Sequence, residues 1–268
     1  MDGKHPIAFT LSDRPMTVSF DNPFSVFAVA LVAQIVAALV GDFIRRRVRS
    51  FEQGERHDFN IIQAASMTLL ALIIGFSFSM AVSRYDQRKT LEEAEANAIG
   101  TEYLRADLLP GDGGSRIREL LKKYLELRIA FYEESDARII VEIGLQTASL
   151  QSELWSVMLP TAVSQATPIV TLVVSGMNDV INAQGYTQAA WWNRIPVGAW
   201  AMMALMAVSC NFLIGYSERR KGELLLFVLP LVVSVGFFLI ADLDSPRGGV
   251  IRVKPQNLLA TSQSLKTT

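Results

Sequence analysis

The stretch Ile61–Leu109 decides the fold, and it reads IIQAASMTLLALIIGFSFSMAVSRYDQRKTLEEAEANAIGTEYLRADLL. Its first part, Ile61–Ser83, carries no charged side chain and is long enough to cross a bilayer core of roughly 30 Å as a helix. Its second part is rich in charged residues, and no proline interrupts it before Pro110. The sequence therefore predicts one continuous rod that leaves the membrane and ends near Leu109.

Three further apolar runs predict membrane-spanning helices, namely Pro23–Gly41, Ile195–Ser217 and Leu224–Ala241. The composition agrees, because 50% of the residues are hydrophobic and only 19% are charged. No alternating strand pattern competes with the helical periodicity. We therefore expect an all-α integral membrane protein with four spans and a helical soluble domain between the second and the third.

The segment between the second and third spans, Arg84–Arg194, is charged and helical in its periodicity. An apolar stripe at helical spacing is formed by Ile117, Leu120, Leu121, Tyr124, Arg128 and Phe131. Ser115 is expected to cap this helix, and Thr167 with Pro168 is expected to open another that runs towards Gln188. The predicted division is an N-terminal segment 1–22, spans one and two in 23–83, the soluble domain 84–194, spans three and four in 195–241, and a tail 242–268.

Several classes of function are disfavoured by composition and by missing motifs. The net charge of −1 gives no basic excess of the kind that binds nucleic acid. Cys210 is the only cysteine and lies in an apolar run, so a disulfide scaffold or a zinc site is not expected. No Walker loop, HExxH, nucleophile elbow or kinase signature occurs, so we predict no catalytic residue and no cofactor.

Acidic residues form two groups that could suggest a cation site. Glu92, Glu93, Glu95 and Glu102 are interleaved with Arg88, Lys89 and Arg105, and we favour a solvated, salt-bridged helix face over a metal cluster. Asp242 and Asp244 follow the last span and are candidate metal ligands, although we expect them to be helix-end residues at the membrane interface. The glycines of Gly111–Gly114 could bind phosphate before a helix, but a simple turn is favoured.

Two stripes on the second span carry the functional hypothesis. Gly75, Ser79 and Ser83 recur every four residues and would let a neighbouring helix approach closely. Thr68, Leu72, Phe76 and Met80 recur at the same interval beside them, and Arg84 follows one turn later. Around an axis shared by several subunits, this second stripe would form a dry constriction that gates ions by dewetting. Periodicity alone favours the alternative, in which the stripe faces lipid or the protein core.

Two segments resemble the bestrophin-like membrane protein family, the bacterial relatives of the bestrophin ion channels. They are GFSFSMAVSRYDQRKTLEEAEANAIGTEYLRADLLP, Gly75–Pro110, and LDSPRGGVIRVKPQNLL, Leu243–Leu259. The portion EANAIGTEYLRADLLP looks the most family-specific. Gly75-Phe76 followed by Arg84-Tyr85 is similar to the end of the bestrophin pore helix, and Asp244-Ser245-Pro246 to the residues after its last span.

The resemblance implies a homo-oligomer in the lipid bilayer, a pentamer whose pore passes small inorganic ions. The three pore-neck positions fall on Phe76, which matches, on Leu72, which is apolar but smaller, and on Thr68, which departs from the pattern. Asp242 and Asp244 do not make up the acidic run of the animal calcium clasp, so calcium gating is not implied. The family includes both anion and cation channels, and Arg84 does not decide between them.

Orientation is the point on which two arguments conflict. The resemblance implies an inner-membrane, multi-pass protein whose soluble domain faces the cytoplasm. By contrast, basic residues are dense in the two short loops, which favours placing those loops in the cytoplasm. They are Arg45, Arg46, Arg47, Arg49, Arg56, Arg219, Arg220 and Lys221.

Three hypotheses therefore follow. The first is an oligomeric ion channel with a pore lined by the second span. The second is a membrane-anchored scaffold or sensor whose helical domain binds a protein partner, since no polar ring is evident deep in the membrane. The third, a membrane enzyme, is the least favoured, because nucleophile, base and metal ligands are missing.

Overall fold

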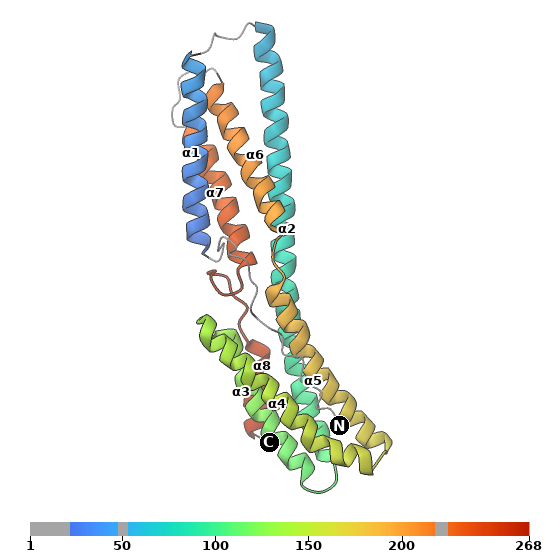
Figure 1. The fold of residues 1–268 in the computed structure, drawn as a ribbon. Helices are drawn as coiled ribbons and strands as arrows, with labels where there is room; N and C mark the ends of the chain where they lie inside the picture. The colour runs from blue at the N-terminus through green and yellow to red at the C-terminus, as the bar shows by residue number, and fades with distance from the viewer. Residues whose placement is uncertain (1–21, 48–52, 218–224, 268) are drawn as a thin grey trace, which may run out of the picture.

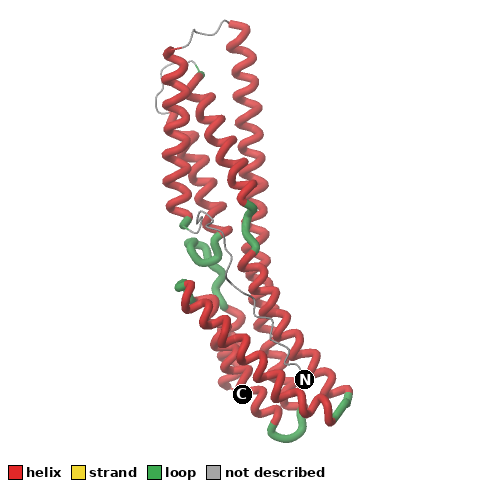
Figure 2. The backbone as a smooth tube through the Cα atoms, viewed as in Figure 1, coloured by secondary structure: helices red, strands yellow, loops and turns green. Residues whose placement is uncertain are grey.

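The computed structural model describes residues 22–47, 53–217 and 225–267. The expectations for most of the N-terminal segment, and for Arg49, Arg219, Arg220 and Lys221, concern residues outside these ranges. Within them the chain is helical, with no strand, as Figure 2 shows. The predicted all-α class is confirmed.

The elements follow one another as helices joined by short connections. They are α1 (Pro23–Arg47), α2 (Gln53–Arg105), the 3-10 turn η1 (Ala106–Leu108), α3 (Gly113–Glu133), α4 (Ala137–Ser164), α5 (Pro168–Trp192), α6 (Val197–Tyr216), α7 (Leu225–Asp244) and α8 (Gln256–Thr267). Figure 1 shows an elongated molecule in which α2 runs almost from end to end. It is the element that joins the two halves.

The membrane half consists of α1, the first part of α2, α6 and α7, which lie side by side in Figure 1. Each of these four is long and apolar enough to cross a bilayer. Their shared core includes Leu70, Trp200, Met203, Phe237 and Ile240. The four predicted spans therefore correspond to four helices of this bundle.

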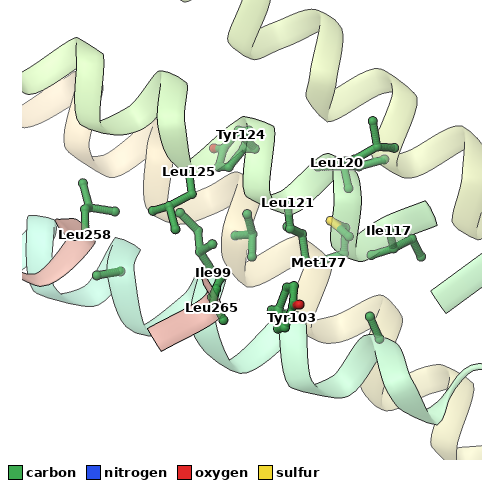
Figure 3. Close-up of a cluster of buried hydrophobic side chains, with 14 of the residues drawn as sticks. Ile99, Tyr103, Ile117, Leu120, Leu121, Tyr124, Leu125, Met177, Leu258 and Leu265 are labelled. Carbon is green, nitrogen blue, oxygen red and sulfur yellow. The ribbon is translucent and has the colours of Figure 1, made fainter. Parts of the chain in front are cut away.

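The soluble half is built from α3, α4, α5 and α8 around the second part of α2 (Figure 1). The stripe predicted on α3, from Ile117 to Phe131, is buried in this core. Figure 3 shows how side chains from α2, α3, α5 and α8 meet there; Ile99, Tyr103, Met177 and Leu258 are examples. One hydrophobic core thus joins the helices between the second and third spans to the C-terminal helix α8.

The helix ends agree with the sequence at one position and differ at another. Thr167 caps α5 by accepting a hydrogen bond from the N–H of Val170 (3.3 Å), with Pro168 in the first turn, as predicted. Ser115 does not cap α3, because the helix already begins at Gly113 and Asp112 occupies the capping position. The turn is made earlier, at Gly111, whose φ of 72° suits glycine.

Candidate pore-lining surface

The predicted pore-lining residues Thr68, Leu72 and Phe76 lie on an exposed face of α2. The side chain of Phe76 is 67% exposed and that of Leu72 is 51% exposed, although both are apolar. Thr68 is exposed too, and its hydroxyl donates to the carbonyl of Ala64 on the same helix (3.0 Å). Nothing in the described part of the chain covers this face.

The lower members of the stripe, Met80 and Arg84, turn partly towards their own chain. Met80 packs against the core of the membrane half. The guanidinium of Arg84 donates to Oδ1 of Asn193 (2.8 Å) and lies 3.7 Å from the sulfur of Met80. The five residues therefore share one side of α2, but the two nearest the soluble half are also anchored within the chain.

The small residues predicted to pack helices, Gly75, Ser79 and Ser83, have no close neighbour in their own chain. A Cβ built on Gly75 meets no atom within 4 Å, and both serines are exposed. Any helix that uses this stripe must come from outside the described chain. The packing role of these residues stays a prediction, and it applies to contacts between copies.

A close helix approach within the chain occurs elsewhere, between α1 and α6. A Cβ on Gly41 would overlap the carbonyl of Phe212, and one on Gly215 would overlap the carbonyl of Ala38. Only glycine permits backbones to pack so closely. The signal in the sequence is the group of small residues Ala37, Ala38 and Gly41 in the first span, for which no packing role was predicted.

A buried polar cluster ties three membrane helices together. Gln34 of α1 donates to Oγ of Ser234 on α7 (3.1 Å) and accepts from Nδ2 of Asn211 on α6 (2.9 Å). All three side chains are buried. Side-chain hydrogen bonds between membrane helices fix their mutual position where lipid gives no hydrophobic driving force. This cluster belongs to the scaffold around α2 and not to its exposed face.

The exposed faces of α1 and α2 differ in chemistry. On α1 the exposed residues from Ala28 to Ile44 are all apolar, and they are Ala28, Val29, Val32, Ala33, Val36, Leu39, Val40, Phe43 and Ile44. On α2 the exposed face combines Leu72 and Phe76 with the hydroxyls of Thr68, Ser79 and Ser83. A surface that meets lipid has no need of hydroxyls, whereas a surface that meets protein or water accommodates them.

Arg88 fixes α2 to the rest of the chain at the junction of the two halves. Its buried guanidinium donates to main-chain carbonyls of Ala190, Asn193, Leu243 and Asp244, at 3.1–3.3 Å. Burial lowers the pKa of this guanidinium to about 10, and it still carries its charge at neutral pH. One side chain thus joins the ends of α5 and α7 to α2.

The two candidate metal ligands at the end of α7 have main-chain partners. Asp242 accepts from the N–H groups of Val250 (2.5 Å) and Ile251 (2.9 Å), and Asp244 accepts from that of Ile195 (3.0 Å). Both carboxylates are buried; Asp242 organises the loop after the last span, and Asp244 holds the connection between α5 and α6. No group of three His, Cys, Asp or Glu side chains that could hold a metal occurs among the residues described.

The acidic residues of the second part of α2 do not form the expected solvated face. Only Glu93 of the four is exposed, while Glu92, Glu95 and Glu102 are buried. The expectation was wrong because α3, α5 and α8 wrap this part of the helix. The sequence does hold a signal for this burial, because one face of the helix recurs at intervals of three and four residues, as buried faces do. Its members are Glu92, Glu95, Ile99 and Glu102.

Glu92 and Glu95 each hold a different element. Glu92 caps α8, since it accepts from the N–H groups of Asn257 and Leu258 (both 2.9 Å) and from Nδ2 of Asn257 (2.6 Å). Glu95 pairs with Arg128 of α3 (2.5 Å) and accepts from the hydroxyl of Thr187 on α5 (3.1 Å). Both glutamates lie in the segment Gly75–Pro110, and this segment therefore binds helices of the soluble half.

The architecture, a four-helix membrane bundle whose second helix continues into a helical domain, is that of a bestrophin. Matching solved structures include a point variant of a bacterial bestrophin homologue from Klebsiella pneumoniae, with TM-score 0.62, 13% identity, and coverage of 90% of this chain and 96% of that one. A structure of the same homologue phased with zinc gives TM-score 0.60, 13% identity, and coverage of 91% and 95%.

The sequence assigns the family as well. The model of the bestrophin-like domain matches residues 26–258, so the chain belongs to the bestrophin-like family. Among curated proteins no relative matches the sequence. The resemblance expected from Gly75–Pro110 and Leu243–Leu259 is confirmed.

Proposed function

We propose that the protein is an oligomeric ion channel in which copies of α2 surround a pore and conduct small inorganic ions passively. The observation that carries this proposal is the exposed face of α2 in the membrane half. In the most apolar stretch of this helix only 11% is buried within the chain. The corresponding share is 22% for α1 and 50% for α7. A helix so poorly covered by its own chain leaves a face on which other copies can pack.

The composition of that face supports a pore rather than a lipid contact. Leu72 and Phe76 would form apolar rings, and the hydroxyl of Thr68 would lie one turn beyond them, on the side away from the soluble half. Apolar rings of this kind block ions by excluding water from a narrow passage. Membership of the bestrophin-like family points to the same role and to a pentamer in the inner membrane.

Purified protein in planar bilayers tests the proposal. Replacing Leu72 and Phe76 together by Ala widens the constriction, so we expect larger ionic currents from a protein that still assembles. The matched control is Val29→Ala together with Val32→Ala on the apolar face of α1, which should leave currents unchanged. A Leu72/Phe76 variant that forms a ring but stays at the level of empty bilayers contradicts the channel function.

A scaffold or sensor is the second candidate, and exposed apolar side chains on α4 favour it. Leu145, Leu159 and Val163 are exposed on the outer side of the soluble half, where a protein partner could cover them. The molecular mass of the detergent-solubilised protein distinguishes the two functions. A ring of several chains supports the channel, and a monomer or dimer supports the scaffold.

A further inference from the structure

Glu102 is a buried carboxyl group in the soluble half for which the fold supplies no partner. Its side chain is 0% exposed, and neither carboxyl oxygen has a hydrogen-bond partner in the described chain. An ionised carboxylate offers about four acceptor sites and is strongly disfavoured in a dry interior without donors. The neutral acid is therefore the form that fits this place.

Helix α5 crosses α2 directly over this carboxyl. A Cβ built on Gly176 of α5 would overlap Oε2 of Glu102 and would lie 2.5 Å from Nη1 of Arg105. The neighbouring Val173 and Met177 are fully buried, and Figure 3 shows Met177 in the core with Tyr103 of α2. The contact between the two helices thus depends on a compact, uncharged group at residue 102.

The charged groups around this contact do not neutralise Glu102. Arg105 on α2 favours ionisation and Asp179 on α5 opposes it. On α3, Arg118 and Lys122 lie over the ring of Tyr103, and Asp107 of η1 pairs with Arg118. The charged residue of α8, Lys266, is exposed.

The balance of these influences favours the protonated form. Burial, with Asp179 adding to it and Arg105 opposing it, raises the pKa of Glu102 from 4.5 to about 8. The carboxyl therefore titrates in the range where cells and their compartments vary.

We propose that Glu102 is a proton-operated latch: the neutral carboxyl holds α5 against α2 at Gly176, and loss of its proton to the aqueous side separates the two helices. The separated state leaves the carboxylate in water. Arg105 lies beside this contact, at the end of α2. Acid closes the latch and alkali opens it.

Proton linkage gives the direction in which pH shifts the opening equilibrium. The closed state binds the proton more tightly than the open state, so rising pH favours opening between the two pKa values. The opening equilibrium should increase about tenfold per pH unit from roughly pH 5 and level off above pH 8. Because α2 is one helix from the membrane to Arg105, the latch regulates the pore if the proposed function holds.

Hydrogen–deuterium exchange of the full-length protein in detergent, corrected for the intrinsic pH dependence of exchange, tests the latch. In wild type, protection of Val173–Val180 and of the end of α2 should fall about tenfold per pH unit and then level off near pH 8. Glu102→Gln keeps the shape without the titration and should remove this slope. Glu93→Gln, on the exposed side of the same helix, should keep it.

A slope that survives in Glu102→Gln, or that is missing in wild type, overturns the proposal. Should Glu102→Gln fail to fold, Gly176→Ala is the second variant. Its methyl group overlaps the carboxyl, so protection of α5 should be lost even at pH 5.5. Protection retained at acid pH in this variant also overturns the latch.

Bilayer currents distinguish the latch from the channel function on which its role rests. Currents that change with pH in wild type and not in Glu102→Gln support both. A pH-dependent exchange slope in a protein that carries no current supports the latch and contradicts the channel.

Discussion

Single acidic residues on α2 position whole helices of the soluble half. Glu92 places α8, Glu95 holds α3 and α5, and Glu102 lies under α5 at Gly176. The buried carboxylates of Glu92 and Glu95 stabilise the fold because their partners are in place, whereas Glu102 has no hydrogen-bond partner and fits its place as the neutral acid. Each residue can therefore be tested by the element that it holds.

Replacing Glu92 by Ala should release α8. The change removes three hydrogen bonds at the start of that helix, and a lost cap costs about 1–2 kcal/mol of stability. Thermal unfolding should occur at lower temperature, and peptides from Gln256–Thr267 should exchange hydrogen faster. Glu93→Ala is the control. Unchanged protection of α8 would contradict the capping role.

At the scale of elements, local patterns could be predicted and distant partnerships could not. The four apolar runs, the buried stripe of α3 and the Thr167-Pro168 helix start follow from residues close in sequence. Gln34 gives no local hint that it bonds to Asn211 and Ser234, which lie 177 and 200 residues away. The candidate pore face could be predicted because its period is local, whereas its supports depend on tertiary contacts.

A glycine packed inside the chain, Gly215, and a glycine on the exposed face of α2, Gly75, should respond differently to a large side chain. Gly215→Leu would overlap the main chain of Ala38, so we expect α1 and α6 to separate and stability to fall by about 1–3 kcal/mol. Gly75→Leu meets no atom of its own chain and should leave the fold intact while lowering the yield of oligomer.

Light scattering after size-exclusion chromatography, together with thermal unfolding, checks this pair. A Gly75→Leu protein that assembles like wild type contradicts the use of the small-residue stripe between copies. A Gly215→Leu protein with normal stability contradicts the close α1–α6 contact.

At the scale of the whole molecule, α2 joins the membrane bundle to the soluble half, so the side on which that half lies matters for regulation. Helix α8 packs on α2 and α3, which places the C-terminal tail with the soluble half (Figure 1). We propose that both face the cytoplasm, as family membership suggests. The last turn of α1, at the end of the bundle away from the soluble half, carries three basic residues, and these favour placing that end in the cytoplasm instead. They are Arg45, Arg46 and Arg47.

Fusions at the C-terminus test this orientation. Green fluorescent protein should fluoresce there, and alkaline phosphatase, which needs export, should be inactive. The reverse pattern would show that the charge of the short loops outweighs the family arrangement.

The most direct test of the central claim, that α2 lines an ion pathway, uses the single cysteine of the chain. Cys210 is buried, and its replacement by Ala gives a background without thiols. Phe76→Cys and Val29→Cys then place a thiol at two membrane positions that are 67% and 70% exposed in one chain. A charged, water-soluble thiol reagent should reduce bilayer currents through the Phe76→Cys protein and leave those of Val29→Cys unchanged. Equal insensitivity of both, in a protein that conducts, would contradict a pore lined by α2.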